Sequence, residues 1–423
     1  MGEDHAAKPV VLVYAEPLLA RSMTFVRSQG ESLRTFVPYY VGPRYLADGL
    51  GLPERRVIVM WRGKSRFSPI AELPFKALGV APFFVRRLRR LKPVLLHAHF
   101  GPMGLRALPL ARALDIPMVV TFHGYDATAP DDLASRSRYF SHRRYVMHRK
   151  ELEKGSSLLL AASQFVRDQL IGQGFSPNKV KVHYIGVDTS LFCPDSNMVR
   201  DPTVLFVGRL EEVKGCEYLI RAMAQVQTAI PAARLLIVGD GPQRRSLERT
   251  ADDGRVRATF VGFQPPSEVK RWMNRASVLA APSVRTCSGS EEGCGLALLE
   301  AQAMGLPVVS FVSGGIPEIV CHGETGFLSS ERDHQSLSRY ILMLLRDKNL
   351  ADRLARTARA RVTRLFDLET QTRALEAIYQ DIIWARTCCP SVQDPAKQGS
   401  AQEDGRRLRL SPTARDCDSS AVS

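Results

Sequence analysis

Short apolar runs alternate with amphipathic segments along most of the chain. Runs that are apolar on both faces and separated by helical segments are typical of parallel strands buried in a doubly wound sheet. The pattern therefore predicts such a sheet in the first half of the chain. Its strands are expected at VVLVYA (10–15), RVIVM (56–60), PVLLHAH (93–99), MVVTFH (118–123) and SLLLAAS (157–163).

The alternation stops and then restarts. Gly, Pro, Asp and Asn cluster in residues 184–202, where apolar periodicity fails, and this composition indicates a domain boundary. We therefore expect two Rossmann-like α/β domains, residues 1–188 and 189–365, with a ligand cleft at the carboxyl ends of their strands. The second set of strands is expected at TVLFVGRL (203–210), RLLIVGDG (234–241), ATFVGF (258–263), SVLAAPS (277–283) and LPVVSF (306–311).

The C-terminal part has helical patterns without strands. A final helix is predicted within residues 366–389, with Asp367 as its N-cap and with Leu375, Ile378 and Ile382 on one face. Residues 390–423 are rich in Pro, Ser, Gln and Arg and poor in apolar residues. We expect that tail to be disordered.

Composition excludes several classes of protein. With 423 residues, 45% of them hydrophobic and 24% charged, the chain is of ordinary globular type. The longest apolar stretch, residues 293–312, is interrupted by Glu300 and Gln302, so no membrane-spanning helix is expected. The first residues, MGEDHAAKP, resemble neither a secretion nor a myristoylation signal, and the eight cysteines form no CxxC pair. We expect a cytoplasmic protein with reduced thiols.

Positive charge is concentrated in the first half, which carries +13 of the net +15. Two segments, residues 81–92 and 135–150, combine apolar residues with arginines in a pattern typical of helices that dock on anionic membranes. The alternative is an apolar stripe that faces the core, with solvated arginines. Binding to nucleic acid is disfavoured because no nucleic-acid-binding motif accompanies the charge.

The segment EEGCGLALLEAQAMGLPVVSF (291–311) predicts an anion site. A turn at Gly293 and Gly295 opens a helix, whose first N–H groups and positive dipole end suit a phosphate. Glu292 and Glu300 would accept hydrogen bonds from hydroxyl groups on either side of that phosphate, which is the layout of a nucleotide sugar. The alternative is a structural turn and a buried helix, with Glu292 solvated.

A second segment, VLFVGRLEEVKGCEYLIRAM (204–223), places two cations directly after a predicted strand. Arg209 and Lys214 could neutralise a diphosphate as it departs from a sugar. The alternative is a solvated loop in which Glu211 and Glu212 form surface ion pairs.

These motifs carry a family resemblance. FVGRLEEVKG, IVGDGP, VGF, EEGCGLALLEAQAMGLPVV and SGGIPEIVCHGETGFL resemble the nucleotide-sugar domain of the family-four retaining glycosyltransferases of GT-B fold. The resemblance implies that Glu292 holds hydroxyls of the donor sugar, Glu300 the ribose, and Arg209 and Lys214 the diphosphate. Cys294 departs from the family, which usually has an aromatic residue there. The full implied donor-binding set is Arg209, Lys214, Gly239, Phe263, Glu292, Gly293, Cys294, Gly295, Leu296 and Glu300.

In the first half, HAHFGPMG (97–104) and TFHGYDA (121–127) resemble the bacterial exopolysaccharide branch of that family, of the colanic acid and amylovoran type. The resemblance places His123 on the donor sugar, in a catalytic set with Glu292, Arg209 and Lys214. The alternative is a structural histidine at a strand end. The family's Gly-rich first loop is missing, so the acceptor-side residues are only candidates: Ser22, Thr24, His99 and Asp126.

No metal or other cofactor is expected. His97 and His99 point the same way on a strand without a third ligand nearby, which favours packing or acceptor contact over metal binding. The only Asp-X-Asp triplet, at 416–418, lies in the predicted disordered tail and cannot preorganise a site.

These observations together predict a retaining glycosyltransferase. It would move a hexose from a nucleotide-diphosphate sugar to a lipid-linked oligosaccharide in bacterial exopolysaccharide biosynthesis, as a peripheral protein on the inner face of the cytoplasmic membrane. By family resemblance the last helix crosses back to the first domain. The alternatives are a sugar-nucleotide epimerase, which needs an acid/base pair at the sugar, and a non-catalytic donor-binding subunit.

Overall fold

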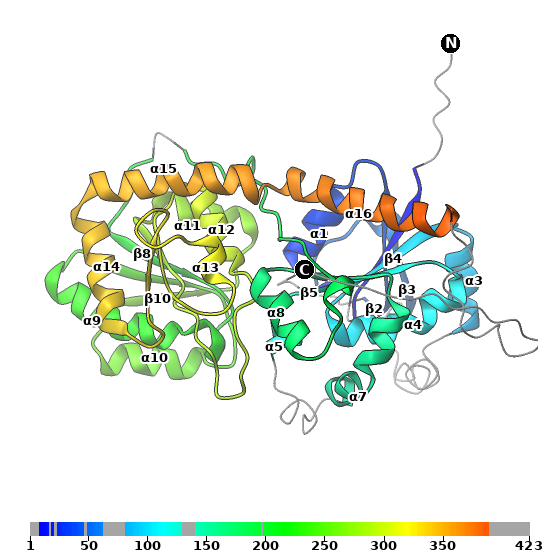
Figure 1. The fold of residues 1–423 in the computed structure, drawn as a ribbon. Coiled ribbons are helices and arrows are strands. Elements are labelled where there is room, and N and C mark those ends of the chain that lie inside the picture. The colour runs from blue at the N-terminus through cyan, green and yellow to red at the C-terminus, as the bar shows by residue number, and fades with distance from the viewer. Residues whose placement is uncertain are drawn as a thin grey trace, which may run out of the picture. The chain divides into compact units, whose positions relative to one another are not determined.

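The computed structural model describes residues 8–16, 18–20, 23–45, 49–61, 81–128, 140–195 and 198–388. Within them lie two parallel sheets, each with helices on both faces (Figure 1). This arrangement confirms the predicted fold class. The predicted tail and the first part of the basic segment 135–150 lie outside the described residues, and the two domain limits stay predictions.

The first sheet has the strand order β3-β2-β1-β4-β5-β6-β7 in the described part of the chain. Its strands are β1 (Val10–Tyr14), β2 (Val37–Arg44), β3 (Val57–Trp61), β4 (Pro93–His99), β5 (Met118–Phe122), β6 (Leu158–Ala161) and β7 (Val180–Val182). The connecting helices are α1 (Thr24–Glu31), α3 (Pro82–Arg89), α4 (Gly101–Leu114), α5 (Tyr125–Thr128), α7 (Phe140–Gly155) and α8 (Gln164–Gly172), with short 3-10 turns at Glu54–Arg56 and Pro177–Lys179.

The second sheet has the order β10-β9-β8-β11-β12-β13 among the described residues. Its strands are β8 (Thr203–Val207), β9 (Arg234–Val238), β10 (Ala258–Gly262), β11 (Val278–Ala280), β12 (Val308–Phe311) and β13 (Phe327–Ser329). Its helices are η3 (Glu212–Lys214), α9 (Cys216–Ala229), α10 (Arg244–Asp253), α11 (Pro266–Arg275), α12 (Leu296–Ala303), α13 (Ile316–Ile319), α14 (His334–Arg346) and α15 (Lys348–Leu365).

Side chains of β8 show how the second sheet is buried on both faces. Val204 and Phe206 pack into the apolar core formed with α9, α10 and α14. Leu205, which points to the opposite face, packs into the core formed with α11, α12 and α15. Because both faces are covered, the strand can be apolar at successive positions, as it is from Val204 to Val207.

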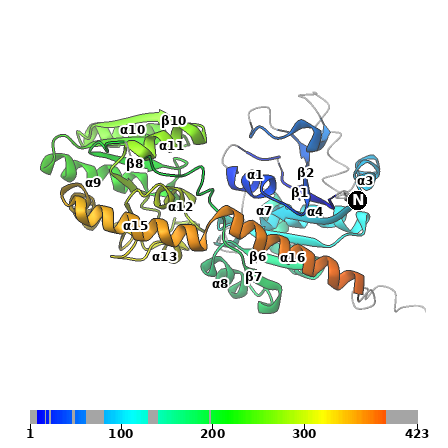
Figure 2. The same cartoon turned by 90° about the horizontal axis from the view of Figure 1, so that it is seen from above.

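The last helix, α16 (Leu368–Cys388), covers one face of the first sheet, as Figure 2 shows. Asp367 caps it through hydrogen bonds from Glu369 N at 3.0 Å and Thr370 N at 3.3 Å, as the sequence predicted. Its buried Glu376 accepts hydrogen bonds from Arg34 N at 2.8 Å and Thr35 N at 2.6 Å. These bonds fix the helix to the segment that leads into β2.

Helix α3 corrects the membrane interpretation of its apolar stripe. Phe84, Val85 and Leu88 are buried in the core of the first sheet, and Leu91 packs against that core, because α3 lies against α4. Phe83 is 54% exposed, so it alone of these five apolar side chains points largely to solvent. The apolar stripe therefore serves the fold, and the arginines on the other face are exposed. No helix among the described residues is both long and apolar enough to span a membrane.

Four histidines lie near the carboxyl end of the first sheet: His97, His99 and His183 are buried, and His123 is partly buried. His97 contacts Tyr379 OH of α16 through Nδ1 at 2.6 Å and Thr121 Oγ1 through Nε2 at 2.7 Å, and His183 Nε2 lies 2.9 Å from Gln371 O. Burial lowers the pKa of His97, His123 and His183, and brings that of His99 to about 3. All four are therefore neutral in the fold at pH 7.

These histidines predict a loss of stability in mild acid. Below about pH 6.5 the unfolded chain binds protons on these histidines that the folded chain does not, which lowers the free energy of unfolding by about 1.4 kcal/mol per pH unit for each such histidine. Glu300 and Asp126, whose pKa values burial raises to about 8 and about 6, bind protons in the folded chain before the unfolded one and offset part of this fall. Denaturant unfolding at pH 7.5, 6.5 and 5.5 measures this slope. His97→Gln should make this slope shallower by about 1.4 kcal/mol per pH unit, because one buried neutral histidine is removed. A flat profile would contradict the prediction.

Candidate active site

The strand order places the site. The second sheet reverses its direction of winding between β8 and β11, and the segments that follow these two strands leave the sheet side by side. Open α/β sheets bind ligands at the carboxyl ends of their strands at such a reversal. The segment after β8 contains Arg209 and Lys214, and the one after β11 leads through Ser283 and Glu292 to helix α12.

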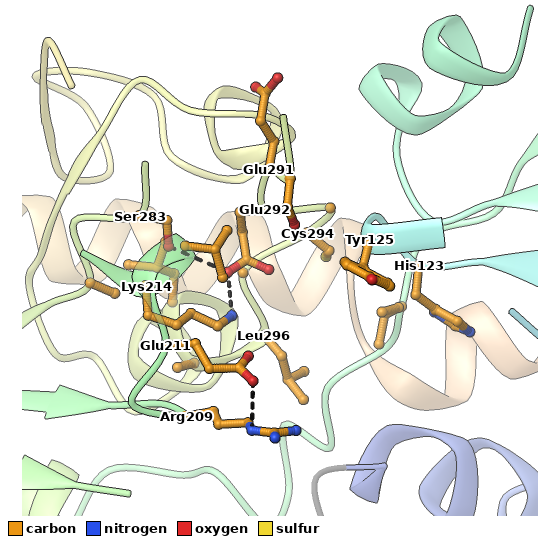
Figure 3. Close-up of a pocket in the computed structure, with 18 of the residues that line it drawn as sticks. His123, Tyr125, Arg209, Glu211, Lys214, Ser283, Glu291, Glu292, Cys294 and Leu296 are labelled. Carbon is orange, nitrogen blue, oxygen red and sulfur yellow. Dashed lines mark hydrogen bonds and ion pairs between the residues drawn. The ribbon is translucent and has the colours of Figure 1, made fainter. Parts of the chain in front are cut away.

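A cavity of about 590 Å³ lies at this position. It is lined by Arg209 and Lys214 and by the start of α12 at Leu296, so the structure brings together the two cations and the helix end that the sequence proposed as a diphosphate site (Figure 3). Side chains of the first half complete the lining: Phe25, Phe100, His123 and Tyr125.

Both cations form ion pairs inside the cavity. Arg209 Nε lies 2.9 Å from Glu211 Oε1, and Lys214 Nζ pairs with Glu292 Oε2. Ser283 Oγ donates to the same Glu292 oxygen at 3.3 Å. Figure 3 shows these contacts as dashed lines, of which the one between Lys214 and Glu292 joins the segment after β8 to the segment after β11.

Gly215 lets these two segments approach each other. Its φ is +61°, and a Cβ there would lie 1.9 Å from the carbonyl oxygen of Pro282. Only glycine accepts both the left-handed backbone and this backbone contact. The close approach positions Lys214, which precedes the glycine, beside Glu292.

Glu292 remains ionised despite its burial. Burial by itself raises its pKa, but the charge and hydrogen bond of Lys214, with donors from Gly295 N and Ser283, lower it below the ordinary value. A carboxylate in this state is a strong hydrogen-bond acceptor. Cys294 beside it is 4% exposed, and burial raises the pKa of its thiol to about 12, so the cysteine is a neutral side chain at this site.

Helix α12 begins at the cavity. Gly295, with φ +75°, forms its N-cap, and Leu296, Ala297 and Leu298 of the first turn line the cavity. The first N–H groups of a helix have no partner within the helix, and together with the dipole they favour an anion. The segment 293–296 therefore has the geometry of a phosphate site.

His123 follows β5 and lies on the opposite wall. Its ring packs between Phe25 and Phe100, with centroid distances of 4.7 Å to each, and its Nε2 lies 3.0 Å from His99 Nδ1. One proton is shared in that contact because both rings are neutral. Its Nδ1 is buried and has no hydrogen-bond partner among the described residues.

Asp126 holds the backbone of the His123 loop. Its carboxylate accepts hydrogen bonds from Gly101 N at 2.8 Å, His123 N at 3.0 Å and Gly124 N at 3.1 Å. Burial raises its pKa to about 6, although the three N–H donors oppose that shift. Asp126 is not among the residues that line the cavity, so its visible role is to fix the loop that carries His123.

Other predicted donor residues lie outside the lining of this cavity. Gly239 packs against the backbone of Gly208, Phe263 follows the edge strand β10 and is 47% exposed, and Glu300 lies in the second turn of α12. Burial raises the pKa of Glu300 to about 8. Their contacts with a donor stay predictions.

The acceptor-side candidates are also dispersed. Thr24 begins α1, and His99 is 1% exposed behind His123, so neither lines the cavity. Ser22 lies outside the described residues. No acceptor contact is assigned to these three side chains by the geometry.

Several residues that line the cavity were not predicted from the sequence. Phe100 directly follows β4 and Ser283 closely follows β11, so their places at strand ends were a usable signal. Tyr125 stands two residues after His123 and is 51% exposed in the cavity wall. Phe25 comes from helix α1, and nothing in its local sequence indicates a site. Among the described residues no group of three or more His, Cys, Asp or Glu side chains is arranged to hold a metal ion.

Comparison with known proteins assigns the two halves to families. The family described as glycosyl transferases group 1 matches residues 195–361, and glycosyltransferase family 4 matches residues 43–191. The putative colanic acid biosynthesis glycosyltransferase WcaL of Salmonella typhimurium is 33% identical over 295 residues, covering 67% of this chain and 70% of the relative. The amylovoran biosynthesis glycosyltransferase AmsK of Erwinia amylovora is 30% identical, covering 67% and 69%.

Solved structures show the same fold at low sequence identity. HepE from Anabaena, in complex with UDP and glucose, has a TM-score of 0.69 and 19% identity, covering 88% of this chain and 100% of that one. The sucrose-phosphate synthase of Thermosynechococcus elongatus has a TM-score of 0.71 and 23% identity, covering 89% and 100%. With two doubly wound domains of the GT-B type and relatives of this kind, the chain belongs to the group 1 and family 4 glycosyltransferases.

Proposed function

We propose that the protein transfers a hexose from a nucleotide-diphosphate sugar to a lipid-linked oligosaccharide during assembly of a bacterial exopolysaccharide, with retention of the anomeric configuration. The observation that carries this proposal is the convergence of Arg209, Lys214 and the start of α12 on one cavity. The names of WcaL and AmsK support the exopolysaccharide assignment, and the complex of HepE with UDP-glucose supports the donor class.

The cavity suggests how the donor would lie. Its diphosphate would occupy the segment 293–296 between the two cations, and its sugar would extend towards His123 and the oxygen of Glu292. By family resemblance Glu300 would hold the ribose. The sugar–oxygen bond to the diphosphate breaks as the acceptor hydroxyl attacks from the same face. The departing phosphate takes the hydroxyl's proton, so positioning and charge stabilisation provide most of the rate.

Removing either cation should reduce turnover more than donor binding. Lys214→Ala or Arg209→Ala is expected to remove roughly 3 kcal/mol of transition-state stabilisation, about a 100-fold loss of kcat, because the leaving group gains charge as the bond breaks. The measurement is release of nucleoside diphosphate from the nucleotide sugar that most raises the Tm in a panel. Arg221→Ala, on α9 outside the cavity, is the control with the same charge change. Wild-type turnover in both cavity variants would refute the proposed clamp.

Turnover should not require a divalent cation. In this proposal the side chains of Arg209 and Lys214 and the amides of α12 supply the charge that a metal ion provides in other transferases. We expect unchanged turnover after incubation with excess chelator. A loss that added magnesium or manganese restores would contradict metal independence.

A lipid-linked acceptor requires access to a membrane. The exposed arginines of α3, Arg86, Arg87 and Arg89, with Arg90 directly after the helix, form a basic surface next to Phe83. Each cation near an anionic leaflet contributes about 1 kcal/mol, so such a group supports reversible docking without an apolar stripe. We therefore propose that this surface docks on the inner face of the cytoplasmic membrane.

Flotation with liposomes tests this docking. The wild-type protein should float with vesicles that contain anionic lipid and not with neutral vesicles, and Arg86→Glu/Arg87→Glu should abolish flotation. Arg353→Glu/Arg356→Glu makes the same charge change on exposed residues of α15 and should float as the wild type does. Equal flotation with neutral and anionic vesicles would remove the electrostatic claim.

A further inference from the structure

The cavity holds more carboxylates than cations among its lining residues. Arg209 and Lys214 face it together with Glu211, Glu291 and Glu292. A nucleoside diphosphate is itself strongly anionic, so each carboxylate that stays near the cations repels it. The affinity for such a ligand therefore depends on how firmly each of the three carboxylates is held near the cations.

Two of these carboxylates are fixed by other partners. Glu292 is 13% exposed and is bound by Lys214 and Ser283. Glu291 is 14% exposed, lies 3.5 Å from Arg285 Nε, and points away from Lys214 in Figure 3. Neither can leave its position without breaking contacts in a largely buried setting.

Glu211 differs from both. Its side chain is 37% exposed, and its Oε1 lies 2.9 Å from Nε of Arg209, which is itself 60% exposed. A hydrogen bond from Glu211 N to Arg209 O at 2.9 Å keeps the two residues in one tight turn, so the pair forms locally. An ion pair between exposed groups contributes little to stability and is displaced easily.

We propose that Glu211 is an internal counter-ion of Arg209, which competes with the nucleoside diphosphate for the guanidinium and limits the affinity for that product. This inference rests on the proposed function. A phosphate on Arg209 must share the guanidinium with the Glu211 carboxylate, so binding of the diphosphate weakens the ion pair between Arg209 and Glu211 and loses part of its own energy to that pair. The consequence is faster release of the product once the sugar has been transferred.

Isothermal titration calorimetry with uridine diphosphate and guanosine diphosphate tests the inference. Glu211→Gln should bind the diphosphate preferred by the wild type roughly 3- to 10-fold more tightly, because the competing charge is gone while the side chain keeps its size. Glu217→Gln is the matched control: it removes a carboxylate that pairs with Arg221 on α9 and does not line the cavity. Its affinity should equal that of the wild type.

The Arg209→Ala variant shows whether Glu211 acts through its ion pair with Arg209 or through the general effect of its negative charge on the cavity. If Glu211 acts through Arg209, then adding Glu211→Gln to Arg209→Ala should change the affinity less than twofold. A gain that persists in that background, an unchanged affinity in the single variant, or a weaker one would each overturn the inference and leave the proposed function intact. Failure of the wild-type protein to bind either diphosphate would overturn both.

Discussion

The site depends on a contact between two backbones. A Cβ on Gly293 would lie 1.9 Å from the carbonyl oxygen of His123, so the segment before α12 and the segment after β5 meet without any side chain between them. The contact is supported nearby by Glu318, whose carboxylate accepts hydrogen bonds at 2.8 Å from Gln164 N and Phe165 N at the start of α8. A carboxylate at that helix end also interacts favourably with the dipole. Because these contacts hold, one cavity has both a cationic wall and a histidine wall.

Within the cationic wall, charges are balanced in pairs. Lys214 lowers the pKa of Glu292 against the effect of burial, which raises it, and Glu292 gives Lys214 a defined position. Such a pair costs little reorganisation when a ligand arrives, since lysine has further N–H donors and the carboxylate has a second oxygen. Arg209 and Glu211 form a more exposed pair of the same kind.

The sequence was sufficient for the fold class and for placing Arg209, Lys214 and Glu292 at one site, and the reasons are local. It did not predict that Glu211 and Glu291 line the cavity or that Glu300 lies outside its lining. Strands such as β8 are apolar at successive positions because both faces of the sheet are covered. Strand β2 (VPYYVGPR) was not predicted because Pro and Gly interrupt its apolar pattern. Strands β7 and β13 were not predicted because they are too short to show a periodic pattern. Periodicity does not tell what covers an apolar stripe, so the sequence left open whether the stripe of α3 faces a membrane or the core. Contacts such as that between Phe25 and His123 join distant segments and leave no local signal.

The excess positive charge of the first half does not lie in the ligand cavity. The part of the cavity wall that this half supplies, Phe25, Phe100, His123 and Tyr125, contains no permanent cation, and burial lowers the pKa of His123 so that it is neutral. In the proposed function, recognition of a diphosphate would therefore fall to side chains of the second half, whose net charge is only +2. Some basic residues of the first half lie exposed outside the cavity, as the arginines of α3 do. The net charge of a domain thus indicates a charged surface. It does not indicate where an anionic ligand binds, because that depends on which strand ends are followed by cationic side chains.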